Sequence, residues 1–192
     1  MTASSTRCCR RHSWLAALAA ALWLFTAAPA RADGIEVKKA ALVAAEDGYF
    51  LEAEFDIALT PTLEDALNKG VPLYFLLEFE LIRPRWYWFN EKLANARQQY
   101  RLSYNALTRQ YRVGVGTLYQ NFGALPEALA FLSRVRLPEI VEAGALGKDA
   151  DYTAALRMRL DSSQLPRPFQ ISAVGSRDWS LSSDWHRWTI SP

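Results

Sequence analysis

The amino-acid sequence predicts a mostly β protein: an antiparallel β-sandwich of immunoglobulin-like architecture, with two short helices in its connections. Several segments alternate apolar and polar residues with the period of two that is typical of half-buried strands. Turn-forming residues separate these segments, and only two short stretches have helical spacing. Many strands set against two short helices favour two packed antiparallel sheets.

The first 32 residues have the features of a cleavable signal peptide. Three arginines precede an apolar stretch, Trp14–Ala28, and two overlapping Ala-x-Ala sites end at Ala30 and Ala32. The apolar stretch is shorter than the roughly 20 residues that a membrane-spanning helix needs. We therefore expect a periplasmic protein whose leader is cleaved after Ala30 or Ala32, with a single domain over residues 33–192.

Loss of the leader changes the charge and the available chemistry. Both cysteines, Cys8 and Cys9, lie in it, so the mature chain is expected to have no disulfide, no thiolate chemistry and no lipid anchor. Four of the 22 basic residues and none of the 20 acidic residues lie before Asp33, which leaves about two net negative charges. This balance gives no reason to expect a nucleic-acid partner.

A short helix followed by a long strand organises the chain. Thr60 can cap a helix over Pro61–Lys69, and Gly70 suits the left-handed residue that ends it. Over Leu73–Arg83 the period changes to two, with five large apolar side chains on one face and two glutamates on the other. We expect this strand to be central to the core.

Other strands alternate in the same way and carry charge on their outer faces. The strand expected at Tyr49–Leu59 is acidic there, whereas those at Leu93–Leu107 and Tyr152–Asp161 are basic. Because opposite charges on neighbouring strands stabilise a sheet by about 0.2–1 kcal/mol a pair, acidic strands should lie beside basic ones. The remaining expected elements are strands at Ile35–Ala45, Gln110–Val115, Thr117–Asn121, Phe169–Val174 and Asp184–Ile190, a helix at Pro126–Arg134, an irregular region at Arg136–Lys148 and an extended connector at Leu165–Pro168.

Five segments carry a resemblance to a known family. They are Ala66–Leu73, Arg83–Trp88, Leu102–Val113, Leu165–Pro168 and Trp179–Trp188. In these segments the chain resembles the exported bacterial proteins grouped as domain of unknown function 4390. The resemblance spans nearly the whole mature chain, but it implies no activity, cofactor or site residue.

Two groups of tryptophan and arginine are the candidate binding residues. Trp and Arg are enriched at binding hot spots, and an Arg can stack on a Trp. Alternatively, these tryptophans close the ends of the core, and the sequence leaves both interpretations open. The candidates are Arg83, Arg85, Trp86, Trp88, Trp179, Trp185 and Trp188.

Catalytic and metal interpretations have weaker support. Asp184 and His186 with Ser182 or Ser183 could form a hydrolase triad, but a nucleophile next to its base in sequence rarely has the required geometry. Paired glutamates on two strands (Glu52, Glu54, Glu78, Glu80) could serve glycoside chemistry, although a solvated acidic face is the simpler interpretation. The mature chain has one histidine and no cysteine, so we expect no zinc site, no other metal and no cofactor.

These observations favour a non-enzymatic binding or accessory module for a protein partner in the cell envelope, such as the outer part of a membrane protein. A carbohydrate- or envelope-ligand-binding module that uses the same tryptophans is the alternative, and a hydrolase comes third.

Overall fold

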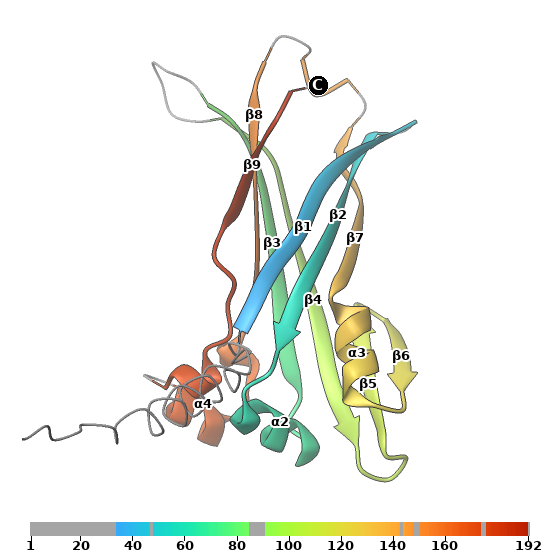
Figure 1. Cartoon of the computed structure of the whole chain (residues 1–192), viewed down its shortest axis with the longest axis vertical. Helices are drawn as coiled ribbons and strands as arrows, with labels where there is room; N and C mark the ends of the chain where they lie inside the picture. The colour runs from blue at the N-terminus through green and yellow to red at the C-terminus, as the bar shows by residue number, and fades with distance from the viewer. Residues whose placement is uncertain are drawn as a thin grey trace, which may run out of the picture. The chain divides into compact units, whose positions relative to one another are not determined.

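The computed structural model describes residues 34–46, 48–84, 91–142, 144–147, 150–173 and 176–191. The chain divides into two units, and all of these residues belong to the second, Asp33–Pro192. The described residues are mostly β, in two antiparallel sheets that form a sandwich-like arrangement (Figure 1). The β-rich fold that the sequence predicts is therefore confirmed.

One sheet has three strands and the other has six. The smaller has the order β1 (Gly34–Ala45), β2 (Gly48–Ala58), β7 (Arg134–Glu142). The larger has the order β6 (Leu118–Phe122), β5 (Gln110–Val115), β4 (Glu91–Asn105), β3 (Leu73–Arg83), β8 (Tyr152–Leu160), β9 (His186–Ile190). The connections contain the helices α2 (Pro61–Asn68), α3 (Leu125–Leu132) and α4 (Arg167–Ala173) and the 3₁₀ turns η1 (Ser162–Gln164) and η2 (Arg177–Trp179).

The core lies between the two sheets. β1 faces β8 and β9, β7 faces β4, and α3 covers β5 and β6 (Figure 1). β3 is at the centre of the larger sheet, and its inward side chains are at most 1% exposed: Leu73, Phe75, Leu77, Phe79 and Leu81. This confirms the expectation that β3 is central.

The helix before β3 begins and ends as its sequence predicts. The Thr60 hydroxyl accepts the Leu63 N–H at 3.2 Å and donates to the Asp178 carbonyl at 2.7 Å. At the other end Gly70 has φ +88°, which glycine adopts without the strain that a Cβ would bring. The buried stripe of α2 then packs as a plug at one end of the sandwich (Figure 1).

Three of the expected elements are wrong, and the described residues contain three short helices where two were expected. The region 136–148, expected to be irregular, contains most of β7, whose alternation is obscured because its pairing with β2 shifts between Leu51 and Tyr49. The segment Phe169–Val174, expected to be a strand, lies largely in α4, which begins at Arg167 within the expected extended connector. Phe169 and Ala173 pack against the core with the i, i+4 spacing of a helix, while Ile171 is 78% exposed.

Candidate functional site

The outer face of the six-stranded sheet, turned away from the smaller sheet, carries six arginines. Glu78 of β3 lies directly opposite Arg97 of β4 and Arg157 of β8. The expectation that acidic and basic strands are neighbours is therefore confirmed for β3. The basic side chains on this face, here called the arginine face, are Lys92, Arg97, Arg101, Arg112, Arg157, Arg159 and Arg187.

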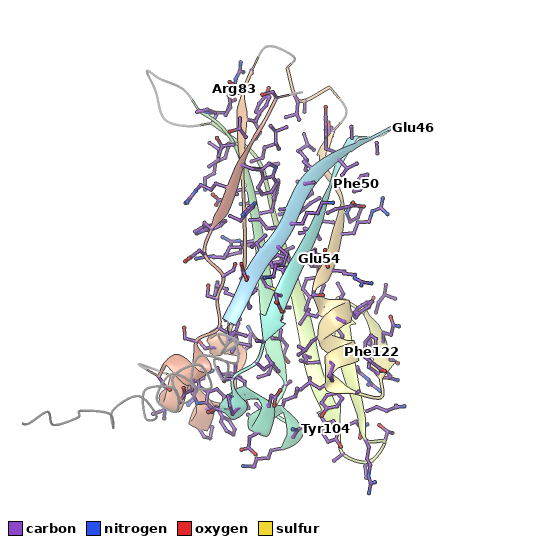
Figure 2. The ribbon with its side chains drawn as sticks, in the orientation of Figure 1. Glu46, Phe50, Glu54, Arg83, Tyr104 and Phe122 are labelled. Atoms are coloured by element: carbon purple, nitrogen blue, oxygen red, sulfur yellow. The ribbon has the colours of Figure 1, made fainter. Side chains whose placement is uncertain are left out.

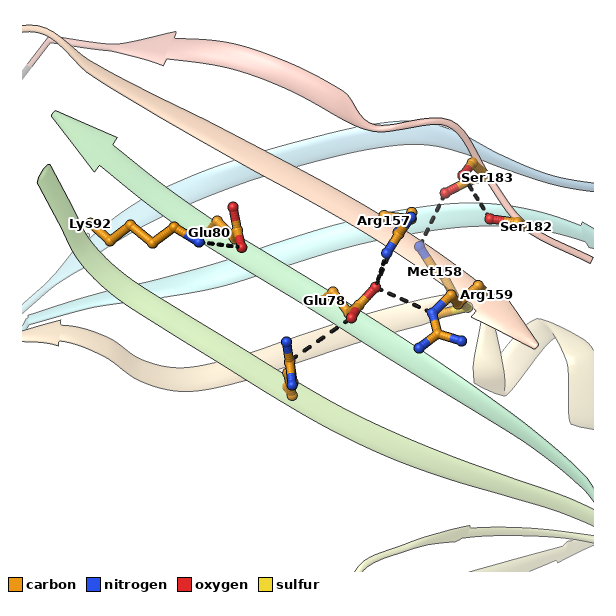
Figure 3. A network of polar contacts seen from close by, with 9 residues as sticks. Glu78, Glu80, Lys92, Arg157, Met158, Arg159, Ser182 and Ser183 are labelled. Atoms are coloured by element: carbon orange, nitrogen blue, oxygen red, sulfur yellow. Dashed lines mark hydrogen bonds and ion pairs between the residues drawn. The ribbon is translucent and has the colours of Figure 1, made fainter. Parts of the chain in front are cut away.

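Glu78 is the centre of an ion network on this face (Figure 3). Its side chain is 11% exposed, and its carboxylate accepts hydrogen bonds from Arg157 and, at 3.3 Å, from Arg159. Arg97 is paired with the other carboxylate oxygen at 3.8 Å. Our expectation that Glu78 would be solvated is wrong, because three long guanidinium side chains close over it. Burial alone would raise the pKa of Glu78, but the hydrogen bonds and charges of Arg157 and Arg159 outweigh it and lower that pKa.

Glu80, two residues further along β3, is bound more loosely. It accepts one hydrogen bond from Lys92 at 3.0 Å, and the side chains are 27% and 60% exposed (Figure 3). Exposed pairs of this kind contribute at most about 1 kcal/mol because water screens them. The described strands of this sheet place two carboxylates, Glu78 and Glu80, on the arginine face. The basic side chains of this face therefore outnumber its acidic side chains.

Trp185 extends the network towards the sheet edge. The guanidinium carbon of Arg157 lies 4.5 Å from the centre of its ring, a cation–π distance. Trp185 is half-buried, and Arg157 is held between the indole on one side and the Glu78 carboxylate on the other. The arrangement fixes an arginine and a tryptophan in one orientation at the surface.

The structure separates the other predicted binding residues. Trp179 is 8% exposed and packs against Phe169 of α4, with ring centres 5.3 Å apart. Trp188 lies on the inner face against Phe79, at 6.3 Å between centres, so it does not join Trp185. Arg83 is exposed at the end of β3 (Figure 2). The remaining predicted residues, Arg85, Trp86 and Trp88, lie outside the described residues.

The residues of the hydrolase alternative are not assembled in the described part of the chain. The Ser183 hydroxyl accepts the Met158 N–H at 3.0 Å and the Ser182 hydroxyl donates to the Ser183 carbonyl, whereas His186 is exposed with its ring beside Trp188. No described hydrogen bond joins His186 to either serine or to Asp184.

The glutamate pairs of the glycosidase alternative belong to different sheets. Glu52 and Glu54 lie on β2 of the three-stranded sheet, where Figure 2 labels Glu54, while Glu78 and Glu80 lie on β3. The two pairs therefore do not face each other across a shared cleft. Among the described residues, no three His, Cys, Asp or Glu side chains gather so that they could hold a metal ion.

None of the described helices has the length and apolar composition that a transmembrane helix requires.

The arginines at the centre of this site are not among the binding residues predicted from the sequence. Arg97, Arg157 and Arg159 are part of the outward basic charge expected on the strands at Leu93–Leu107 and Tyr152–Asp161. One feature of the sequence could have indicated the site: the outward side chains of one strand are acidic and those of two others are basic. When such strands pair directly, a carboxylate of the acidic strand lies between arginines of both neighbours.

Comparison with known protein families places the chain in a family. A family model described as a domain of unknown function, DUF4390, matches residues 32–189. No curated protein and no solved structure matches the chain. Since the matched range covers nearly all of the sequence and includes both sheets except for the last residue of β9, the chain belongs to the DUF4390 family.

Proposed function

We propose that this protein is an exported periplasmic binding or accessory module, without catalytic activity, for a protein partner in the cell envelope. The observation that carries the proposal is the arginine face. A mature chain with about two net negative charges places six arginines and Lys92 on one side of one sheet, with two glutamates among them. Such a local field attracts and orients a partner of the opposite charge.

The fixed orientation of side chains on this face also supports a binding role. Arg157 is already held by Glu78 and Trp185, so little rotamer freedom remains to be lost when a partner docks. Three arginines share the single carboxylate of Glu78, which leaves positive charge available for a partner. Arg and Trp are also the side chains that most often carry binding energy at interfaces.

We propose further that the sandwich has immunoglobulin-like connectivity. In chain order β1, β2 and β7 take the places of strands A, B and E, while β3, β8 and β9 take those of C, F and G, with β4 and β5 as C′ and C″. A second feature supports this assignment. Tyr152 begins the F-like strand, and its hydroxyl accepts the N–H of Gly147, five residues upstream, at 2.8 Å, as in the tyrosine corner of such domains.

The periplasmic location rests on the leader. The positive region, the short apolar stretch and the two small-residue sites ending at Ala30 and Ala32 support export and cleavage. The matched family range begins at residue 32, next to the second of these sites. In this proposal the domain acts in the periplasm after the leader is removed.

The structure favours the protein partner over the carbohydrate alternative. A sugar-binding tryptophan offers an open ring face, whereas one face of Trp185 is covered by Arg157 and Trp179 is buried. Trp86 and Trp88, which follow β3 in sequence, stay predicted contact residues, and the experiment below includes one of them.

Site-specific photo-cross-linking in the periplasm tests the proposal. A photoreactive residue replaces Trp185 on the arginine face, Trp86 in the β3–β4 connection, or, as a matched aromatic control, Phe50. Phe50 lies on β2 with Arg136 over its ring at 4.2 Å, so it offers a similar surface on the other sheet (Figure 2).

We expect a discrete protein adduct from position 185 and none from position 50, with a yield that falls as salt is raised because exposed charges are screened. Equal yields from both positions, or no adduct at 185, would contradict the proposal.

A further inference from the structure

A groove lies on the arginine face, over β3 to β6. It has a volume of about 390 Å³. Among the described residues, its lining consists of two arginines, two tyrosines, neutral polar side chains, two glycines and Leu118, and none of these is acidic. The residues that carry the argument are Tyr74, Gln99, Arg101, Arg112, Gly114 and Tyr119.

Each arginine of the groove is placed by an aromatic ring. The Arg112 guanidinium carbon lies 4.5 Å from the centre of the Tyr119 ring, and its Nε donates to Asn121 at 3.0 Å. Arg101 lies 5.8 Å from the centre of the Tyr74 ring. The two guanidinium groups are therefore held on opposite walls of the groove.

Neither arginine is neutralised by a carboxylate in the described part of the chain. All described ion pairs of this face involve Glu78 or Glu80, which engage other basic residues. Asp161 follows β8 next to Tyr74 in the sheet, but its carboxylate accepts the backbone N–H and the hydroxyl of Ser163. Within the part of the chain that the structure describes, the groove therefore has positive charge without a counterion of its own.

Gly114 keeps the floor of the groove low. In register it lies between Arg101 on one side and Tyr119 on the other. A Cβ at this position would meet the Leu118 carbonyl at 3.6 Å, an ordinary contact distance. A larger side chain would therefore be tolerated by the backbone but would project between the two walls.

The walls of the groove are open to solvent. Arg101, Arg112 and Tyr119 are exposed, and Leu118 at the rim is 77% exposed. A small molecule normally has 70–90% of its surface buried in its site, which an open groove on a sheet cannot provide. A protruding segment of a larger partner needs no such enclosure, because neighbouring contacts share its binding energy.

We propose that this groove binds carboxylate side chains of an acidic segment of the partner protein, with Arg101 and Arg112 as the pairing groups. The inference rests on the function proposed above, because the groove is continuous with the arginine face. Arginine matches carboxylate geometry with two parallel hydrogen bonds, which favours this pairing. Charge complementarity selects an acidic partner.

Amide NMR of the exported protein tests this inference, because glycine amides lie in a separate spectral region and report on the groove floor. The probe is a short oligoglutamate peptide, and oligoglutamine of equal length is the neutral control. We expect oligoglutamate alone to shift the Gly114 and Gly116 amides in a saturable manner. Replacement of both Arg101 and Arg112 by Gln should weaken the apparent affinity by about tenfold, or about 1.4 kcal/mol.

Two further variants separate the groove from a general charge effect. Arg109→Asn with Arg134→Gln removes the same charge elsewhere, at exposed positions, and should leave the affinity unchanged. Gly114→Val keeps every charge but fills the floor, and should weaken binding about as much as the arginine replacements. If the remote variant weakens oligoglutamate binding equally, or if Gly114→Val binds oligoglutamate as tightly as the unchanged protein, the proposed binding in the groove is wrong.

Other probes address other occupants. Stronger shifts with inorganic phosphate or phosphatidylglycerol vesicles than with oligoglutamate would overturn the proposal in favour of phosphate-bearing ligands. No shift with oligoglutamate, together with a discrete cross-link from position 185, would refute the groove while the proposed function stood. Failure of the cross-link as well would refute both.

Discussion

Replacement of Glu78 by Gln should destabilise the fold more than any other change to an acidic side chain on the arginine face. The substitution keeps the shape of the side chain but removes the charge that Arg157, Arg159 and Arg97 share. Hydrogen bonds to charged groups are worth about 1.5–3 kcal/mol, and loss of a partner from a fully buried pair costs about 3–5 kcal/mol. Because the arginines keep partial contact with water, we expect a loss of about 1.5–3 kcal/mol.

Glu80→Gln provides a matched control on the same strand and face. Its pair with Lys92 is more exposed, so the loss should stay below about 1 kcal/mol. Urea unfolding at pH 7 measures both. If Glu78→Gln is as stable as Glu80→Gln, or more stable than the unchanged protein, the desolvation cost of the network exceeds its attraction and our reasoning is wrong.

The same network predicts a pH dependence. The pKa of Glu78 is lowered from its ordinary value of 4.5 in the folded state, so its ionised form is favoured by folding. The resulting stability is fully present above pH 4.5 and is lost as the pH falls through the lowered folded-state pKa. The stability difference between the unchanged protein and Glu78→Gln should therefore shrink below pH 4.5. A constant difference across this window would contradict the assignment.

Three further outcomes are expected. Phe75→Ala should cost about 3–5 kcal/mol in urea unfolding because the ring is fully buried, and a loss below about 1 kcal/mol would contradict its central position. Tyr152→Phe removes the hydroxyl that accepts the Gly147 N–H and should cost about 0.5–1.5 kcal/mol, whereas no loss would contradict a stabilising role for this hydrogen bond. Intact-mass measurement of the exported protein should show chains that begin at Arg31 or Asp33, and a retained leader would refute the cleavage prediction.

Much of the sheet could be predicted because its strands alternate strictly and are bounded by turn residues. The bounds of β3 and β5 match the prediction, and the cap at Thr60 lies where its spacing places it. β7 was missed because a shift in its pairing with β2 interrupts its regular pattern. α4 was missed because Phe169 and Ile171 alternate like strand residues. In the structure Phe169 and Ala173, four residues apart, face the core, and Ile171 is exposed.

The site was only partly accessible from the sequence. Charge alternation predicted that β3 would have a basic neighbour, which is a local property of paired strands. The burial of Glu78 and the stacking of Arg157 on Trp185 depend on three strands meeting, and no spacing in the sequence reports that. Likewise, three tryptophans that lie within ten positions of one another point into different layers, because β9 alternates and η2 packs against α4.

Hydroxyl-radical footprinting with the native cell-envelope fraction tests the central claim most directly, since it measures which side chains a partner covers. In the purified protein we expect labelling of all three probes: Trp185 and Tyr119 on the arginine face, and Phe50 on the other sheet. With the envelope fraction at low salt, we expect labelling of Trp185 and Tyr119 to fall several-fold while Phe50 stays unchanged, and protection to be lost at high salt. Unchanged labelling of Trp185 and Tyr119, or equal protection of Phe50, would contradict the claim that the arginine face is the contact surface.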